Sequence, residues 1–329
     1  MLTISCLEVI AEAITPIALD TYCGSALRGA FFRAIWSRFC TNRESPTCSV
    51  CPLVMACPVA SLVAPLRDEA TYGRDVPRPY VISPPCKEPN RYEQGETLTF
   101  SFSLVGASAK LFPYVIRSLQ EMERANFGHP LPELGGRRGR FSIREVYAYH
   151  PLTGERQLLW EKGSTRPQKP QIWVTPGDVS AYAEQLPSDH VTLEFLSPTR
   201  LIFNEHLVKH PGFRVLMLRL AERFKHLQQE YSDDAGEARK EEAPTDQEWY
   251  RQIDAQASEV HLAKDETHWV DVQSYSTRQR KTTPIGGFIG KASFTGELTH
   301  LRELLVWGQM LHVGKNAVKG NGLYRIEIC

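Results

Sequence analysis

The sequence predicts an α+β protein of two tandem ferredoxin-like (RRM-like) domains, with a cysteine-rich metal-binding insertion in the first domain. The main observation is that periodic patterns run strand, helix, strands, helix, strand up to residue 149 and restart after residue 187. The second is a cluster of four cysteines directly after the first predicted helix. We therefore expect a first domain at 1–149, a hairpin and junction at 150–187, and a second domain at 188–329.

The first domain is predicted from alternation and helical spacing. Residues 2–10 alternate as a strand, and a helix follows whose N-cap we expect at Ser25 and whose apolar residues fall on one face. Residues 96–104 alternate strictly and form the clearest strand in the chain. A helix at 111–122 and a strand at 141–149 complete the unit, with a flexible basic loop at 135–140 between them.

The insertion at about residues 40–60 contains half of the eight cysteines, spaced C-x7-C-x2-C-x5-C. A reducing compartment keeps thiols free, so close cysteines favour a metal over disulfides. A closed tetrahedral zinc site is the preferred interpretation; an iron–sulfur cluster, or buried cysteines without metal, are the alternatives. The predicted ligands are Cys40, Cys48, Cys51 and Cys57.

The second domain repeats the first pattern. Residues 190–203 are strand-like with a break at Pro198, and 213–231 form a long amphipathic helix. Strand patterns return at 260–263, 269–275 and 284–294. A helix at 298–311 and a strand at 323–328 close the domain.

Composition describes a globular chain without a membrane-spanning segment. It is 42% hydrophobic, and no apolar run approaches the length of a membrane span, so we expect a cytoplasmic protein with no membrane partner. The formal net charge is zero, but residues 232–248 carry seven acids against two bases. The rest has 36 bases and 31 acids, a mildly basic balance that is compatible with RNA binding.

Two glycine-rich basic loops could bind phosphate. Residues 312–322 combine three glycines, two lysines and one histidine, and glycine allows backbone N–H groups to face an anion. Residues 135–140 place three arginines among glycines. The alternative is that the first loop merely closes a domain and the second is a solvated turn.

The order of these motifs resembles the CRISPR repeat-processing endoribonucleases of the RAMP superfamily. The resemblance rests on the sequence from His312 to Gly322 before the last strand, the stretch 273–290, residues 27–31 and residues 139–141. It implies two ferredoxin-like domains that bind CRISPR repeat RNA and cut precursor crRNA without a metal cofactor. The products would be a 2′,3′-cyclic phosphate and a 5′-hydroxyl. It also implies that other subunits of a CRISPR effector complex are partners.

The resemblance further implies where the site residues lie. The first helix lines the cleavage site in that family, which makes Tyr22, Arg28 and Arg33 candidates, together with His312 from the glycine-rich loop. Many relatives carry an early catalytic histidine, whereas no histidine precedes His129 here, and Arg33 stands at one such position. The predicted RNA-binding residues are Arg137, Arg138, Arg140, Tyr275, Arg278, Arg280, Lys281, Gly314, Lys315, Lys319, Gly320 and Gly322.

The candidate catalytic residues also have structural explanations that involve no function. Tyr22 is also typical of a half-buried aromatic, and the arginines are also typical of solvated surface charge. His312 is also typical of a helix-end histidine that is satisfied by a carbonyl.

Two functions therefore remain. The first is an active repeat-specific endoribonuclease, and the second is a catalytically inactive subunit of the same fold that holds the repeat-derived handle of crRNA in an effector complex. The missing early histidine favours the second. A zinc-dependent DNA-binding protein would need a recognition helix beside the cysteines, and the sequence shows none.

The cysteine cluster gives the first testable prediction. If the four thiolates hold structural zinc, the purified protein should contain about one zinc per chain, and Cys48→Ser should lower thermal stability more than activity. Elemental analysis of folded, unoxidised protein measures the metal, and visible absorption would reveal iron–sulfur instead. Metal content near zero would contradict the prediction.

Overall fold

A computed structural model describes residues 1–65, 76–85, 90–232, 244–276 and 280–327. The chain divides into an N-terminal unit, Thr3–Val174, and a C-terminal unit formed by Thr175–Cys329 with Met1–Leu2. The division falls inside the junction predicted at 150–187 rather than at residue 149, because the first half of that segment pairs with the first sheet.

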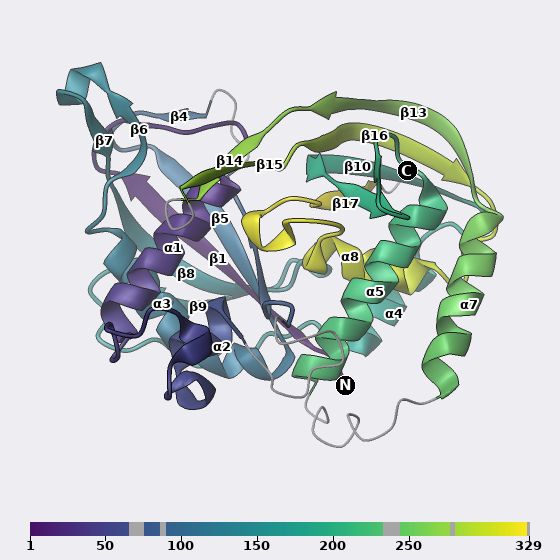
Figure 1. Cartoon of the computed structure of the whole chain (residues 1–329), viewed down its shortest axis with the longest axis horizontal. Helices are drawn as coiled ribbons and strands as arrows, with labels where there is room; N and C mark the ends of the chain where they lie inside the picture. The colour runs from purple at the N-terminus through teal and green to yellow at the C-terminus, as the bar shows by residue number, and fades with distance from the viewer. Residues whose placement is uncertain (66–75, 86–89, 233–243, 277–279, 328–329) are drawn as a thin grey trace. The chain divides into compact units, whose positions relative to one another are not determined.

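A five-stranded antiparallel sheet forms the centre of the N-terminal unit (Figure 1). Its order is β3 (Tyr80–Ser83), β5 (Thr97–Val105), β1 (Ile4–Ala13), β8 (Phe141–Tyr149) and β9 (Arg156–Glu161). Numbered along the chain, the first four strands stand in the order 2-3-1-4, and a long helix lies in the connection before the second strand and another in the connection before the fourth. This is the arrangement of a ferredoxin-like unit.

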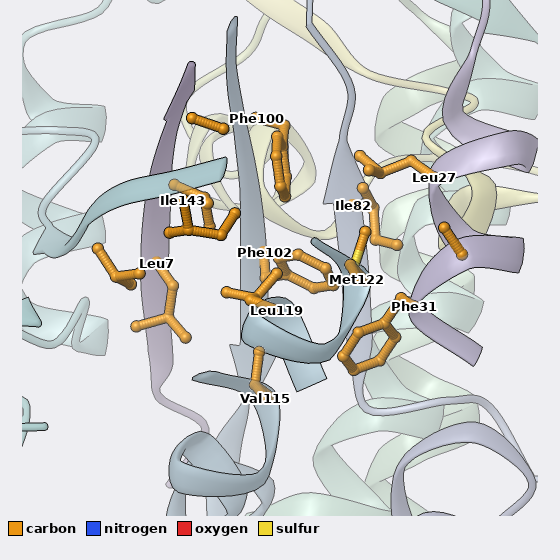
Figure 2. Packing of buried hydrophobic residues seen from close by; sticks show 14 of the residues in the cluster. Leu7, Leu27, Phe31, Ile82, Phe100, Phe102, Val115, Leu119, Met122 and Ile143 are labelled. Carbon is orange, nitrogen blue, oxygen red and sulfur yellow. The ribbon is translucent and has the colours of Figure 1, made fainter. Parts of the chain in front are cut away.

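Two helices, α1 (Gly24–Phe39) and α3 (Phe112–Met122), cover one face of this sheet and enclose the core. Figure 2 shows Phe31 of α1 and Leu119 of α3 packed over Phe102 of β5. The rings of Phe31 and Phe102 lie 4.9 Å apart, and both side chains are buried. Burial of such aromatic side chains contributes about 2 kcal/mol each, so this face supplies much of the unit's stability.

Small elements surround the sheet. Short strands β2 (Ile17–Ala18) and β4 (Arg91–Tyr92) pair with each other, as do β6 (Phe127–Leu131) and β7 (Arg137–Gly139). The segment 135–140, predicted as a flexible loop, is therefore largely one arm of a hairpin. Residues 40–63 form two 3₁₀ turns, η1 (Cys48–Val50) and η2 (Val54–Ala56), followed by α2 (Pro58–Val63).

The C-terminal unit repeats the ferredoxin-like order. Its sheet runs β13 (His261–Val270), β16 (Gly287–Thr295), β10 (His190–Thr199) and β17 (Tyr324–Glu327), again 2-3-1-4 along the chain. The two crossover helices are α5 (Phe213–Tyr231) and α8 (Arg302–Leu311), which pack against each other.

Four further elements complete this unit. Helix α4 (Pro176–Glu184) packs on α8, and α7 (Pro244–Ser258) packs on α5. One hairpin is β11–β12 (Leu201–Phe203 with His206–Val208), and the other is β14–β15 (Gln273–Ser276 with Lys281–Pro284), which is labelled in Figure 1. The acidic segment predicted after residue 232 lies mostly outside the described residues.

Of two local predictions, one differs from the structure and one agrees with it. The residue that precedes α1 is Cys23, and no side-chain hydrogen bond caps this helix, so the N-cap predicted at Ser25 is wrong. Ser25 lies within the first turn instead. The irregularity predicted at Pro198 is confirmed, because the register of β10 against β16 shifts between Phe195 and Thr199, and a separate strand, β11, begins at Leu201.

Candidate nucleic-acid interface

The glycine-rich loop, residues 312–322, is a tightly packed connection between α8 and β17. Gly322 has φ +72°, and a Cβ there would lie 1.8 Å from the carbonyl oxygen of Val313. Gly314 has φ +79° and would similarly meet the Arg200 carbonyl at 2.5 Å. Only glycine fits these two positions, because the backbone passes too close for any side chain.

The backbone amides of this loop are mostly used inside the protein. The N–H groups of Val313, Lys315 and Gly322 donate to the carbonyls of Gly322, Arg200 and Pro198 at 2.9, 3.0 and 3.2 Å. Those of Lys319, Gly320 and Asn321 donate to carbonyls within the loop. The expectation that the loop's N–H groups face a phosphate is therefore wrong for these six amides. Gly320 and Gly322 are buried, so they shape the loop rather than present a contact surface.

His312 is buried at the end of α8, with 1% of its surface exposed. Its Nδ1 lies 3.2 Å from the carbonyl oxygen of Asn321, to which it donates in the Nδ1–H tautomer. Burial lowers the pKa of His312 to about 3, and the nearby Arg223 guanidinium acts in the same direction. A neutral ring enclosed in this way cannot reach a substrate phosphate. The catalytic role predicted for His312 thus conflicts with its position, which fits the alternative of a helix-end histidine satisfied by a carbonyl.

Cations and one aromatic side chain gather where the loop meets the β14–β15 hairpin. Tyr275 is 63% exposed on this hairpin, and Arg280 and Lys281 are exposed beside it. Lys319 reaches the hairpin with its Nζ, 3.4 Å from the hydroxyl of Ser274, and Lys315 is exposed in the loop. Predicted residues that are distant in sequence therefore form one basic surface. Arg278 lies outside the described residues.

Arg200 belongs to the same surface and was not predicted from the sequence. Its backbone carbonyl accepts from Lys315, its guanidinium donates to the Gly286 carbonyl at 3.1 Å, and it lies 5.9 Å from the Trp269 ring centre. The only sequence signal was a single arginine after a strand, which is common on any surface. Exposed aromatic rings beside cations are what single-stranded RNA needs for stacking and phosphate contact.

The residues predicted on the first helix lie in the N-terminal unit. Tyr22 is half-buried just before α1, and Arg33 is exposed on it. Arg28 is half-buried, with its guanidinium 5.5 Å from the Phe32 ring centre and close to the buried hydroxyl of Tyr80. Burial raises the pKa of Tyr80, although the Arg28 charge opposes this. That these residues face the glycine-rich loop across a scissile phosphate stays a prediction, because the two groups belong to different units.

The arginines of the β6–β7 hairpin form a second basic surface. Arg137 and Arg138 are exposed, and each is anchored by a hydrogen bond to a backbone carbonyl, of Leu134 at 3.1 Å and Gly128 at 2.7 Å. Arg140 follows the strand and is also exposed. The same hairpin carries His129, whose Nε2 lies 2.9 Å from Asp20 Oδ1. Sequence analysis did not single out this pair, because 109 residues separate its members.

The four cysteines do not form a ready metal site. Among the residues that the structure describes, no three His, Cys, Asp or Glu side chains are placed to hold one ion. The four thiols are half-buried at the ends of α1, η1 and α2, and Asn42 Nδ2 lies 3.5 Å from the Cys51 sulfur. Zinc binding stays a prediction that metal analysis decides.

In the described part of the chain no helix has both the length and the apolar character to span a bilayer.

Comparisons with known families cover most of the chain. Residues 2–172, more than half of the chain, match a family model described as the AF_1859_N N-terminal domain. Residues 193–324 match a second model, described as CRISPR-associated endoribonuclease Cas6. No curated protein matches the chain.

Solved structures show the same fold at low sequence identity. A product complex of a Cas6 protein aligns with a TM-score of 0.57 at 16% identity, over 98% of this chain and 100% of that one. A Cas6 from Thermus thermophilus aligns with a TM-score of 0.51 at 14% identity, over 99% of both chains. A partial Cas6-RT-Cas1–Cas2 complex gives 0.57 at 11% identity, over 99% of this chain but 46% of the larger one.

The buried His312 predicts a specific loss of stability in acid. The unfolded chain binds a proton below about pH 6.5, whereas the folded protein does so only near pH 3, so stability falls as the pH drops. Between pH 7 and pH 5 this contribution is about 2 kcal/mol. Urea unfolding should show that His312→Gln lacks this part of the pH dependence. The exposed His190→Gln serves as the control, and identical pH profiles for both variants would contradict the burial argument.

Proposed function

This chain belongs to the Cas6-type family of CRISPR-associated proteins, and we propose that it binds CRISPR repeat RNA and cleaves precursor crRNA. The observation that carries the proposal is the basic surface of the β14–β15 hairpin and the glycine-rich loop, within the residues that match the Cas6 model. Tyr275 can stack on a base there, while Arg200, Lys281 and Lys315 can neutralise phosphates.

The proposed cleavage uses the RNA's own 2′-hydroxyl as the nucleophile. Its oxygen attacks the neighbouring phosphorus, the P–O5′ bond breaks, and the products are a 2′,3′-cyclic phosphate and a 5′-hydroxyl. The protein must align the three atoms, accept the 2′-hydroxyl proton and stabilise the charged phosphorane. Positively charged side chains such as Arg28 and Arg33 can supply the last function, and none of these steps calls for a metal ion.

The second candidate function is that of a catalytically inactive RNA-binding subunit, called the silent subunit below. It is supported by the absence of a histidine before His129 and by the burial of His312, which leave Tyr22, Arg28 and Arg33 as the catalytic candidates named from the sequence. Such a subunit would use the same basic surfaces to hold the repeat-derived handle of crRNA. We also propose CRISPR proteins as partners, since structural neighbours include a Cas6-RT-Cas1–Cas2 assembly.

The active interpretation predicts metal-independent cleavage at one position in the repeat. The purified protein should cut a cognate member of a panel of end-labelled hairpin and linear CRISPR repeat RNAs in the presence of EDTA. Gel analysis and phosphatase treatment identify the cyclic phosphate. The control is the same RNA with a 2′-deoxy nucleotide at the cleaved position, which should bind but stay intact. Tight binding of the unmodified repeat without cleavage would instead support the silent subunit.

The two basic surfaces predict RNA affinity that depends on salt. Replacing Arg138 or Lys281 by Ala should weaken binding across repeat sequences and lower the slope of log affinity against log salt by about 1 for each lost contact. Fluorescence anisotropy at several salt concentrations measures both effects. Arg251→Ala is the matched control, because Arg251 is an exposed arginine on α7 outside both surfaces. Equal slopes for all variants would show that these loops are only solvated surface.

A further inference from the structure

The N-terminal unit contains an exposed histidine–carboxylate pair beside the start of α1. His129 Nε2 lies 2.9 Å from Asp20 Oδ1, and the two side chains are 52% and 69% exposed. Asp20 precedes the first residue of α1, Gly24, by four positions, and β6, which carries His129, contacts α1. The pair is therefore open to solvent and lies near the start of α1, the helix that carries Arg28 and Arg33.

Close backbone packing holds the histidine in this place. Gly128 has φ +86°, and a Cβ there would lie 2.4 Å from the Ala18 carbonyl, so β6 approaches β2 closely. This contact places His129 beside Asp20, two residues after Ala18. Arg138 donates to the Gly128 carbonyl at 2.7 Å, and Asn90 donates to the Asp20 carbonyl at 3.1 Å. Both partners of the pair are thus fixed through their backbone, while their side chains remain accessible.

The pair has the geometry of an oriented general base. A carboxylate only accepts hydrogen bonds, so the contact with Asp20 holds the neutral ring in the tautomer with the proton on Nε2. Nδ1 then carries a lone pair that can accept a proton from a substrate. The carboxylate also stabilises the imidazolium that forms, as it does in hydrolytic triads. Arg138, on the same hairpin, offers a phosphate contact next to the base.

The two other histidines considered, His150 and His312, do not have an accessible ring that could act as a general base. The unit has two histidines in its sequence, and the second, His150, is 4% exposed. His312 of the other unit is buried and neutral at physiological pH. Of the described histidines in the N-terminal unit, His129 is the exposed one. It has a carboxylate partner, Asp20, and lies near the start of α1 and near Arg138.

We propose that His129, oriented by Asp20, is the general base of this protein's RNA cleavage, an inference that rests on the proposed endoribonuclease function. Nδ1 takes the proton of the 2′-hydroxyl as the 2′-oxygen forms its bond to phosphorus. The P–O5′ bond breaks with its electron pair going to the 5′-oxygen, which takes a proton from solvent. The imidazolium returns its proton to solvent after the cyclic phosphate has formed. His129 would touch the reacting atoms, and Asp20 would be a positioning residue.

Single-turnover cleavage of a repeat RNA that the unmodified protein cuts tests this assignment. His129→Ala should slow cleavage by about 10²–10⁴-fold while the Kd for the 2′-deoxy repeat changes less than about twofold. Added imidazole should restore part of the rate to His129→Ala, which a purely structural role would not allow. Asp20→Asn should give a smaller loss of rate, with the amide still able to accept from the ring. Circular dichroism checks that the variants are folded.

The matched control is His190→Ala, which removes another exposed histidine paired with an aspartate, His190 Nδ1 to Asp189 Oδ1 at 2.8 Å, in the C-terminal unit. It should cleave at the unmodified rate. Normal cleavage by His129→Ala would overturn the assignment and leave the endoribonuclease function intact. A parallel loss of binding and cleavage would make His129 a binding contact only and would also overturn it. If the unmodified protein binds but cuts no repeat, both the base and the proposed cleavage are excluded.

Discussion

The fold depends on one constraint in each unit: the first strand must find hydrogen-bond partners along both of its edges. In the N-terminal unit Val9 of β1 pairs with Phe100 on one side and Val146 on the other. In the C-terminal unit β10 pairs with β16 and β17. Because an unpaired buried backbone group costs free energy, neighbours distant in sequence must return to these strands, and the helices that connect them must cover the apolar face.

This constraint fixes the places where functional side chains can stand. Buried apolar side chains occupy the space between each sheet and the two helices that cover it. The exposed cations and polar pairs named above therefore lie mainly on hairpins and connections. The β6–β7 hairpin lies against β2 through glycine contacts at Gly128 and Gly139, where any side chain would collide with backbone. Six backbone amides of the glycine-rich loop donate hydrogen bonds to carbonyls within the loop and to those of Pro198 and Arg200. Both connections keep exposed cationic side chains that can contact phosphate.

Buried charge explains why the conspicuous histidine of the loop is structural. Arg223 on α5 donates to the Leu311 carbonyl at 2.7 Å, at the C-terminal end of α8, where the helix dipole favours a cation. Burial lowers the pKa of Arg223 to about 10, so the guanidinium stays charged at neutral pH. A second positive charge on the adjacent His312 would then be costly, and the ring remains neutral. The burial that stabilises the loop therefore keeps the His312 ring neutral and away from a substrate.

The sequence by itself determined the two ferredoxin-like units, since strand alternation and helical spacing are local patterns that show which face of each element is apolar. The strand at 141–149 and the helix at 213–231 match the structure to the residue. Motif order also determined the family, and with it the basic loops. Only the tertiary structure decided which residues are accessible: it buried His312, joined Lys319 to the β14–β15 hairpin, and brought His129 to Asp20. Exposure and contact between distant residues depend on how the strands pair, and no local pattern carries that information.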